Sequence, residues 1–456
     1  MNSIKKIQSE LGKEYSCVDI TKKFLKTIED KKDINAFITI RAEALEEAKS
    51  IDKKLKEGKK LTGVMGVPMA IKDNILIKGT RCTAASKILD NYIAPYSANV
   101  IDKLEGAIIL GKTNMDEFAH GSSGEHSAYG ATKNPNNTEY VPGGSSSGSA
   151  ASVAGDMAVC ALGSDTAGSV RQPASFCGVV GLKPTYGAVS RYGLMSMVCS
   201  LDQIGPLTNS VEDAEMVFNT IKGKDERDST SLDYEVEDDK KEFVVGIPEE
   251  LINNIDTDVK GIFDDSIKKL EEKGVKFKSI KMPHFKYGIS CYYIITPAEI
   301  SSNLSRYDGV KFGMSSRSGD ILSNYLETRG QYFGEEVKRR IMIGTHVLSS
   351  GYYDAYYLRA QKVRTKIVED FNNAFEDVDL IFTPTAPSLP FKFGDMMDPL
   401  SMYMSDLLTV PASLAGVPAI SLPAGRVGDL PVGMQFIAPV LKEKRLFNIG
   451  KLFEQC

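Results

Sequence analysis

The chain has 456 residues, 42% of them hydrophobic and 25% charged, and its net charge at pH 7 is −5. This is the composition of an ordinary globular protein, and no apolar run is long enough to cross a bilayer. The slightly acidic balance gives no indication of a surface that binds nucleic acid directly. The first residues lack the apolar segment of a signal peptide, so we expect a cytoplasmic protein without membrane contacts.

Cysteine and histidine are scattered along the chain. The seven cysteines form no Cys-x-x-Cys pair, which argues against a disulfide framework and a zinc cluster, and we expect reduced, structural thiols. The four histidines are not spaced as metal ligands, so no metal site is expected. Because histidine is scarce, the base for any nucleophilic serine is expected to be another residue type.

The predicted elements alternate between helices and strands. Apolar residues at helical spacing predict amphipathic helices over 14–32 and 41–58. A short apolar strand within 61–74 is expected to end at Lys72 and Asp73, and residues 260–375 are mostly helical by pattern. A further helix is predicted at 98–105, and further strands at 107–112, 159–163, 178–182, 243–247, 379–383, 417–422 and 432–437.

This order of elements indicates an α/β fold with a central mixed β-sheet covered by helices on both faces. We interpret the whole chain, 1–456, as a single domain. Its expected parts are N-terminal helices (1–60), a catalytic core (61–221), an exposed polar connection (222–241), and a helical lobe with returning strands (242–456).

Residues 143–173 carry the strongest chemical signal in the chain. Their glycine and serine content alone would suit a flexible linker. However, an Ala-rich helical segment, an apolar run and a second Gly/Ser turn follow one another here. The order predicts a loop, helix, strand, loop unit in which Ser145 and Ser169, 24 residues apart, could lie side by side.

A serine hydroxyl at neutral pH needs a base within hydrogen-bond distance to act as a nucleophile. Lysine can be that base only when burial removes its charge. Lys72 follows the apolar residues 67–71, so it could be drawn into the interior, with Ser145 relaying a proton between Lys72 and Ser169. The alternative is a surface Lys72 that pairs with its neighbour Asp73.

Three segments resemble the signature of the amidase signature family. The resemblance implies that Ser169 is the nucleophile that forms an acyl-enzyme, that Ser145 is a bridging serine after a cis peptide bond, and that Lys72 is the base. The segments are 71–74 (IKDN), 143–149 (GGSSSGS) and 163–173 (GSDTAGSVRQP). If Lys72 is to be neutral, Asp73 should point away from its amine.

The same resemblance assigns the remaining parts of the site. The turn at Thr166, Ala167 and Gly168 corresponds to the oxyanion hole. Arg340 and Asp406 correspond to a substrate clamp for the carboxylate and the amino group of glutamine, a pairing that suits a zwitterionic amino acid. Arg339 is an alternative to Arg340, and either arginine could instead face solvent.

Motifs outside the signature are most similar to the branch of the family that serves tRNA-dependent amidation. That similarity implies hydrolysis of L-glutamine, with the ammonia passed on for amidation of Glu-tRNA(Gln) or Asp-tRNA(Asn). It also implies two partner subunits, a small one and one that binds tRNA, ATP and Mg²⁺, and no cofactor on this chain. The motifs lie at 114–118, 134–135, 181–187, 200–206, 349–357 and 384–387.

Four positions depart from the family pattern. Ala167 stands where a glycine is usual, so either its φ is negative or the oxyanion hole is altered. His120, Gly124 and His126 are unusual near the expected amide pocket. Two alternatives therefore stay open, a stand-alone amidase for another carboxamide and a catalytically weak assembly subunit.

Overall fold

The structure is a computed structural model that describes residues 3–456 except 234–237, 239, 253–254, 318 and 397. The described strands form one 11-stranded sheet with the order β1-β3-β2-β4-β6-β5-β10-β11-β9-β7-β8. The strands are β1 (Phe37–Ile40), β2 (Pro68–Lys72), β3 (Ile108–Thr113), β4 (Cys160–Asp165), β5 (Val180–Lys183), β6 (Gln203–Thr208), β7 (Val244–Ile247), β8 (Lys276–Ser279), β9 (Leu380–Pro384), β10 (Ala419–Val427) and β11 (Leu430–Ile437).

The sheet is mixed. Parallel pairs join β2 to β3 and β4, and β7 to β8 and β9, whereas the pairs across the middle of the sheet, from β4 through β6, β5, β10 and β11 to β9, are antiparallel. The edge strand β1 also pairs with β3 in the antiparallel sense. This confirms the mixed sheet predicted from the sequence.

Helices fill the segments between the strands. The α-helices are α1 (Ile4–Glu10), α2 (Cys17–Asp30), α3 (Ala44–Lys56), α4 (Asn99–Lys103), α5 (Ser147–Ala154), α6 (Arg171–Cys177), α7 (Val211–Ile221), α8 (Glu249–Ile252), α9 (Thr257–Glu272), α10 (Gly288–Asn303), α11 (Ile321–Tyr332), α12 (Glu335–Val347), α13 (Arg359–Asp377), α14 (Pro399–Met404), α15 (Val410–Leu414) and α16 (Glu443–Phe453). Short 3₁₀ turns are η1 (Lys32–Ile34), η2 (Lys87–Leu89), η3 (Glu117–Ala119), η4 (Phe285–Tyr287) and η5 (Leu304–Arg306), and η6 (Tyr353–Leu358) is a π-helical turn.

Alternate residues of the returning strands enter two different cores. In β9, Phe382 packs into the core shared with α9 and α16, whereas its neighbour Ile381 packs into the core shared with α10 and α13. Phe436 and Ile437 of β11 divide in the same way. Because successive side chains of a strand point to opposite faces, this part of the sheet is covered by helices on both sides.

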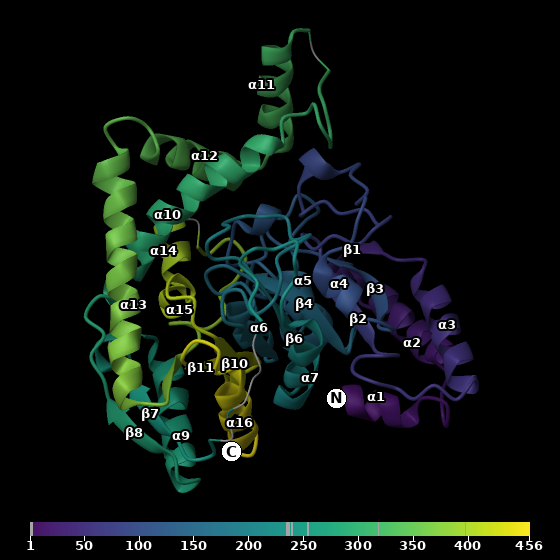
Figure 1. The fold of residues 1–456 in the computed structure, drawn as a ribbon, viewed down its shortest axis with the longest axis horizontal. Coiled ribbons are helices and arrows are strands. Elements are labelled where there is room, and N and C mark those ends of the chain that lie inside the picture. The colour runs from purple at the N-terminus through teal and green to yellow at the C-terminus, as the bar shows by residue number, and fades with distance from the viewer. Residues whose placement is uncertain (1–2, 234–237, 239, 253–254, 318, 397) are drawn as a thin grey trace.

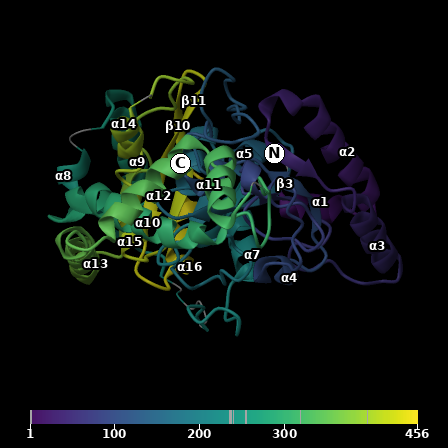
Figure 2. The same ribbon diagram turned by 90° about the horizontal axis from the view of Figure 1, so that it is seen from above.

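Figure 1 shows α2 and α3 at one end of the molecule and the green helices α10 to α13 at the other. The view from above in Figure 2 gives the same arrangement, with α5 between the two ends. The N-terminal helices pack on β2 and β3, and the helical lobe is held together by contacts of α10 with α12 and α13. The predicted site residues come from the central part and from the helical lobe.

Most predicted elements are present within a few residues of their expected bounds, including the helices over 14–32 and 41–58 and the largely helical segment 260–375. The sequence patterns missed α1, β1, β6 and β8. The edge strands β1 and β8 lack a strong apolar alternation, and β6, with the sequence QIGPLT, contains a glycine and a proline.

The polar connection is less exposed than predicted. Leu232 N–H donates to the Gly187 carbonyl and Ser190 Oγ donates to Asp225, so the segment lies along residues 187–190. Asp225 is buried. The prediction for 222–241 is therefore wrong for these contacts, because serine and aspartate side chains bind the backbone and each other here instead of water. Residues 234–237 and 239 lie outside the described part of the chain.

The surface and the thiols add three findings for the described residues. None of their helices is long and apolar enough to cross a membrane. No cluster of three or more potential metal-ligating side chains occurs among them. All seven cysteines carry free thiols, and five of these are buried.

Candidate active site

Lys72 is completely buried at the carboxyl end of β2. Its Nζ donates to Ser145 Oγ at 2.8 Å, to Ser146 Oγ at 2.9 Å and to Ser164 Oγ at 2.9 Å. Burial lowers the pKa of Lys72 from 10.5 to about 7, although the charges of Asp116, Asp165 and Asp202 oppose the shift. The interior position of Lys72 is confirmed, and its amine can be neutral near pH 7.

Asp73 points away from the amine of Lys72, as predicted. Its carboxylate accepts hydrogen bonds from the N–H and the hydroxyl of Thr83, and Lys112 Nζ lies 3.6 Å from its Oδ1. The alternative in which Lys72 sits at the surface and pairs with Asp73 is therefore wrong. The backbone turns after β2, and this turn separates the two neighbouring charges.

Ser145 lies at the turn that precedes α5, and the Gly144–Ser145 peptide bond is cis. A Cβ atom on Gly144 would lie 2.1 Å from Asp116 Oδ2, so only glycine fits there. The Gly144 N–H also donates to Gln172 Oε1 at 2.9 Å. The turn that carries Ser145 is thus held from two sides by buried polar side chains.

Ser169 lies on the turn between β4 and α6. Its carbonyl accepts a hydrogen bond from the Ser146 N–H at 3.1 Å, which joins the two serine-bearing turns directly. Below the turn, Asp165 accepts the Val170 and Arg171 N–H groups and forms a buried ion pair with the Arg171 guanidinium. The linker interpretation is wrong, because residues 143–173 form buried, hydrogen-bonded structure.

The turn before Ser169 leaves donors open. Among the described residues, no group accepts a hydrogen bond from the backbone N–H of Ala167, Gly168 or Ser169. Thr166 is fixed by its hydroxyl, which donates to Asp202 Oδ1 at 2.7 Å. Ala167 has no positive φ, which resolves the first alternative for this position in favour of a regular backbone. Gly168 has φ 156°, and a Cβ there would lie 2.4 Å from Thr409 Oγ1.

Arg340 and Asp406 are both buried, on α12 and just after α14. The Arg340 Nε donates to Glu336 Oε1 at 2.7 Å, and Asp406 Oδ2 accepts the Ser122 hydroxyl at 2.6 Å. Burial is the main cause that raises the pKa of Asp406 to about 7, and the charge of Arg340 opposes it. Arg340 and Ser122 line one cavity of about 240 Å³.

A hydrogen-bond chain connects this cavity to the serine turns. Ser122 donates to Asp406, and its carbonyl accepts from Gln172 Nε2 at 2.8 Å. The same Gln172 side chain accepts the Gly144 N–H beside Ser145. Arg340, Asp406, Ser145 and Lys72 are therefore parts of one connected polar region. Such a region offers a neutral base, serine hydroxyls and charged groups for a polar substrate, which suits acyl transfer.

The comparison with known proteins agrees with this chemistry. A sequence profile of the amidase family matches residues 19–447. This chain belongs to the amidase family. Membership makes it an enzyme of the amidase type, and a Ser, cis-Ser, Lys triad is typical of that family.

Three relatives place the chain within the amidase family. The amidase-type subunit of the glutamyl-tRNA(Gln) amidotransferase from Carboxydothermus hydrogenoformans is 52% identical over 99% of this chain and 96% of its own length. The crystal structure of the corresponding protein from Thermotoga maritima has 42% identity and a TM-score of 0.81, covering 98% of this chain and 93% of that one. The peptide amidase of Stenotrophomonas maltophilia has 26% identity and a TM-score of 0.84, covering 100% and 96%.

The unusual residues of this amidase lie beside the cavity. Burial is the main cause that lowers the pKa of His120 to about 3, so the ring is neutral, and its Nδ1 donates to the Glu117 carbonyl at 3.0 Å. Its Nε2 has no hydrogen-bond partner among the described residues. His126 lines the cavity with Arg340, and a Cβ on Gly124 would lie 2.7 Å from Ser147 Cβ.

Sequence reasoning missed several residues that contact the predicted site. Ser146 and Ser164 share the Lys72 amine with Ser145, and no pattern in the sequence distinguished them from the other serines of the motif. The other missed residues are Asp116, Gln172, Asp202, Glu336, Tyr293 and Tyr403. Most of these approach from distant parts of the chain, so only the fold brings them together.

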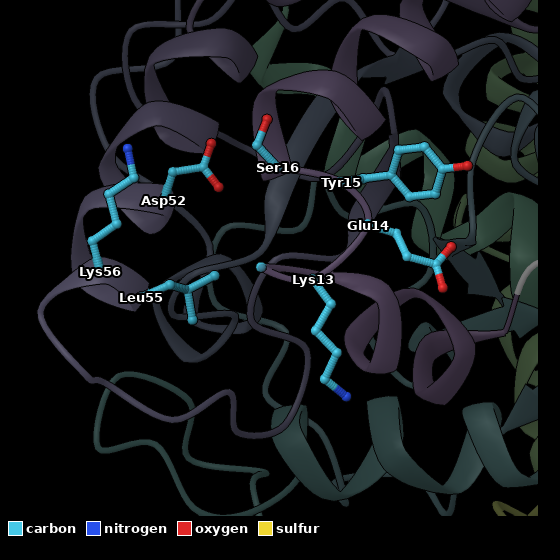
Figure 3. Close-up of a pocket in the computed structure, with 8 residues that line it drawn as sticks. Lys13, Glu14, Tyr15, Ser16, Asp52, Leu55 and Lys56 are labelled. Atoms are coloured by element: carbon cyan, nitrogen blue, oxygen red, sulfur yellow. The ribbon is translucent and has the colours of Figure 1, made fainter.

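A larger concavity lies elsewhere on the amidase. It has a volume of about 420 Å³ and is lined by residues between α1 and α2 and by residues of α3, including Lys13, Tyr15, Asp52 and Lys56. Figure 3 shows these side chains around its opening. None of the predicted catalytic or clamp residues lines it, so the site is assigned to the smaller cavity by its chemistry.

Proposed function

We propose that this chain is the glutamine-hydrolysing subunit of a tRNA-dependent amidotransferase. It releases ammonia from L-glutamine through an acyl-enzyme on Ser169, and a partner subunit uses that ammonia to amidate Glu-tRNA(Gln) or Asp-tRNA(Asn). The observation that carries the proposal is the buried Lys72 amine on Ser145, connected through Gln172 to a cavity that contains Arg340. The name of the relative at 52% identity supports the choice of substrate.

In the proposed mechanism neutral Lys72 takes the Ser145 proton while Ser145 takes the proton of Ser169. The Ser169 oxygen attacks the carboxamide carbon, and the negative charge that develops on the carboxamide oxygen is stabilised by N–H groups of the turn at Thr166, Ala167 and Gly168. The proton returns through Ser145 to the leaving nitrogen, which departs as ammonia. Water, activated along the same path, then hydrolyses the glutamyl ester and frees Ser169.

The clamp fixes the substrate for this attack. Arg340 binds the α-carboxylate and Asp406 binds the α-amino group, since a guanidinium fork fits a carboxylate and an ionised carboxylate fits an ammonium. Arg340 is preferred to Arg339 because Arg340 is buried, whereas 46% of the Arg339 side chain is exposed. Binding of an ammonium beside Asp406 favours the ionised form of that carboxyl.

The proposal includes the setting of the enzyme. The whole chain acts as one domain in the cytoplasm and requires no cofactor of its own. Two companion subunits complete the enzyme, a small one and one that binds tRNA, ATP and Mg²⁺ and makes most contacts with tRNA. The names of the relatives support an amidotransferase assembly.

A stand-alone amidase is the second candidate, and the likeness to a peptide amidase favours it. The deciding experiment measures ammonia release by the purified chain and by its native complex from L-glutamine and from propionamide, a small neutral amide. We expect turnover of glutamine and its loss, by about 10³-fold or more, in Ser169→Ala. Turnover of propionamide without glutamine would favour the stand-alone amidase. Amidation supported only by added ammonia would favour a catalytically weak assembly subunit.

A further inference from the structure

Glu336 is a buried carboxylate in the first turn of α12, next to a surface carboxylate on the same turn. Its side chain is 8% exposed, whereas that of Glu335 is 87% exposed and pairs with Lys338. Glu336 Oε1 accepts from Arg340 Nε at 2.7 Å and from the Tyr403 hydroxyl at 3.2 Å. Its Oε2 accepts from Arg339. All the hydrogen-bonding capacity seen at Glu336 is thus directed at the cavity wall.

These contacts define the orientation of the Arg340 guanidinium. A guanidinium has five N–H donors in a planar fork, and a carboxylate is best bound by two of them in parallel. Glu336 occupies only the Nε side. Within the described part of the chain, no residue accepts a hydrogen bond from the two terminal nitrogens of Arg340, and Arg340 lines the 240 Å³ cavity. The terminal nitrogens are therefore left for a ligand.

Two tyrosines limit rotation of the same guanidinium. The rings of Tyr293 and Tyr403 are stacked with centroids 3.7 Å apart, and the Arg340 Cζ atom lies 5.3 Å and 5.5 Å from those centroids. A guanidinium is attracted to aromatic faces. Tyr403 also donates its hydroxyl to Glu336, so the aromatic pair and the carboxylate form one support.

The charges explain why this support is a carboxylate. Burial, the largest effect, raises the pKa of Glu336, but the charge and the hydrogen bond of Arg340, with the charge of Arg339, outweigh it and lower that pKa. Glu336 is therefore ionised at neutral pH. Asp406 is the other buried carboxyl close enough for the charge of Arg340 to affect its pKa. Without Glu336, the Arg340 cation would have Asp406 as its remaining acidic partner.

We propose that Glu336 is a positioning residue for the substrate. It holds Arg340 through Nε so that both terminal nitrogens are presented to the substrate carboxylate, and it keeps Arg340 from pairing with Asp406, which must stay free for the substrate amino group. The ligand class is thus a carboxamide that carries a carboxylate and an ammonium on one carbon. This inference rests on the proposed function in one respect, that Arg340 binds a substrate carboxylate.

The test compares Glu336→Gln with the matched control Glu335→Gln, which removes an acidic group from the same helical turn without touching Arg340. Steady-state rates are measured with L-glutamine and with propionamide, which lacks both charged groups. For Glu336→Gln we expect the KM for glutamine to rise about tenfold or more. The kcat and the turnover of propionamide should stay within twofold of wild type. Glu335→Gln should leave both substrates unchanged.

Two results would overturn the proposal. One is a glutamine KM of Glu336→Gln within twofold of wild type, and the other is an equal loss on glutamine and propionamide, which indicates a general structural role. Tyr403→Phe provides a second variant if Glu336→Gln does not fold. It removes one hydrogen bond to Glu336 and should raise the glutamine KM about threefold, again without affecting propionamide. An unchanged KM in Tyr403→Phe would count against the support.

A separate arm distinguishes this inference from the proposed function. If the wild-type enzyme turns over propionamide but not glutamine, the proposed function fails while the position of Arg340 can still be tested. Butyrate, a simple carboxylate, is then used as an inhibitor of propionamide turnover. A weakening of butyrate inhibition of about tenfold in Glu336→Gln, with none in Glu335→Gln, supports the positioning role. Equal inhibition in all three enzymes overturns it.

Discussion

Asp73 and Lys112 form a completely buried ion pair, with Lys112 Nζ 3.6 Å from Asp73 Oδ1. The pair engages the one carboxylate adjacent in sequence to Lys72. Lys72 is left with hydroxyl groups and a carbonyl oxygen at hydrogen-bond distance. A lysine in these surroundings can lose its proton near neutral pH, and this is the condition for the proposed base.

The first prediction concerns the pH dependence of activity. Lys72 must be neutral to accept a proton, and burial lowers its pKa from 10.5 to about 7. We therefore expect kcat/KM to increase with pH along a limb with its midpoint near 7, measured with a neutral amide so that the clamp does not titrate. A limb with its midpoint near 10 would show that Lys72 keeps an ordinary pKa and would contradict the mechanism.

The second prediction concerns the free energy of unfolding. Between about pH 7 and 10.5 the unfolded chain holds the Lys72 proton and the folded chain does not, so this group makes stability rise with pH in that window. Below pH 7 the buried charge destabilises the fold, by an amount on the order of 5 kcal/mol from a shift of roughly 3.5 units. Lys72→Met should thus be more stable than wild type at pH 6, with a difference that shrinks toward pH 10 in urea titrations.

The third prediction concerns the turn before Ser169. A methyl group on Gly168 would lie 2.4 Å from Thr409 Oγ1, so Gly168→Ala must displace the turn and should reduce kcat by about 10²-fold or more. Gly261, inside α9, has no atom within 4 Å of an added Cβ and serves as the control. Gly261→Ala should leave kcat unchanged and stabilise the fold by about 0.5–1 kcal/mol. Normal kcat in Gly168→Ala would argue against a rigid oxyanion turn.

The fourth prediction separates the two neighbouring arginines. Arg340 is buried beside the cavity, whereas the Arg339 side chain is half exposed and makes its ion pair with Glu336 at the rim. Arg340→Met should raise the KM for glutamine about 10²-fold while propionamide turnover stays near wild type. Arg339→Met should change the KM by no more than about threefold. The reverse order would assign the carboxylate to Arg339.

The fifth prediction concerns the ion pair below the nucleophile turn. Arg171 is fully buried and bonds Asp165, the Thr409 carbonyl and Ser413, so it connects α6 with the segment that carries α15. Arg171→Met leaves the Asp165 charge buried without its cation and should destabilise the fold by about 3–5 kcal/mol in chemical denaturation. The double variant Asp165→Asn, Arg171→Met should recover part of that loss. A loss below about 1 kcal/mol in Arg171→Met would contradict this account.

The sequence by itself determined the local chemistry of the site. The order of glycines, serines and apolar residues over 143–173 was enough to predict two adjacent serine turns, and the apolar run before Lys72 was enough to suggest its burial. The mixed sheet followed from the alternation of helices and strands. These features are local, because a turn, a strand or a helix depends on the spacing of residues that are neighbours in the chain.

Only the tertiary structure decided which groups surround those residues. Glu336 reaches Arg340 from within one helix, but Tyr403, Asp406 and Ser122 come to the same cavity from segments far apart in the chain. Asp73 was separated from Lys72 by its contact with Lys112 on β3. The pKa of a buried group depends on desolvation and on charges gathered by the fold, and the linear order of residues does not contain that information.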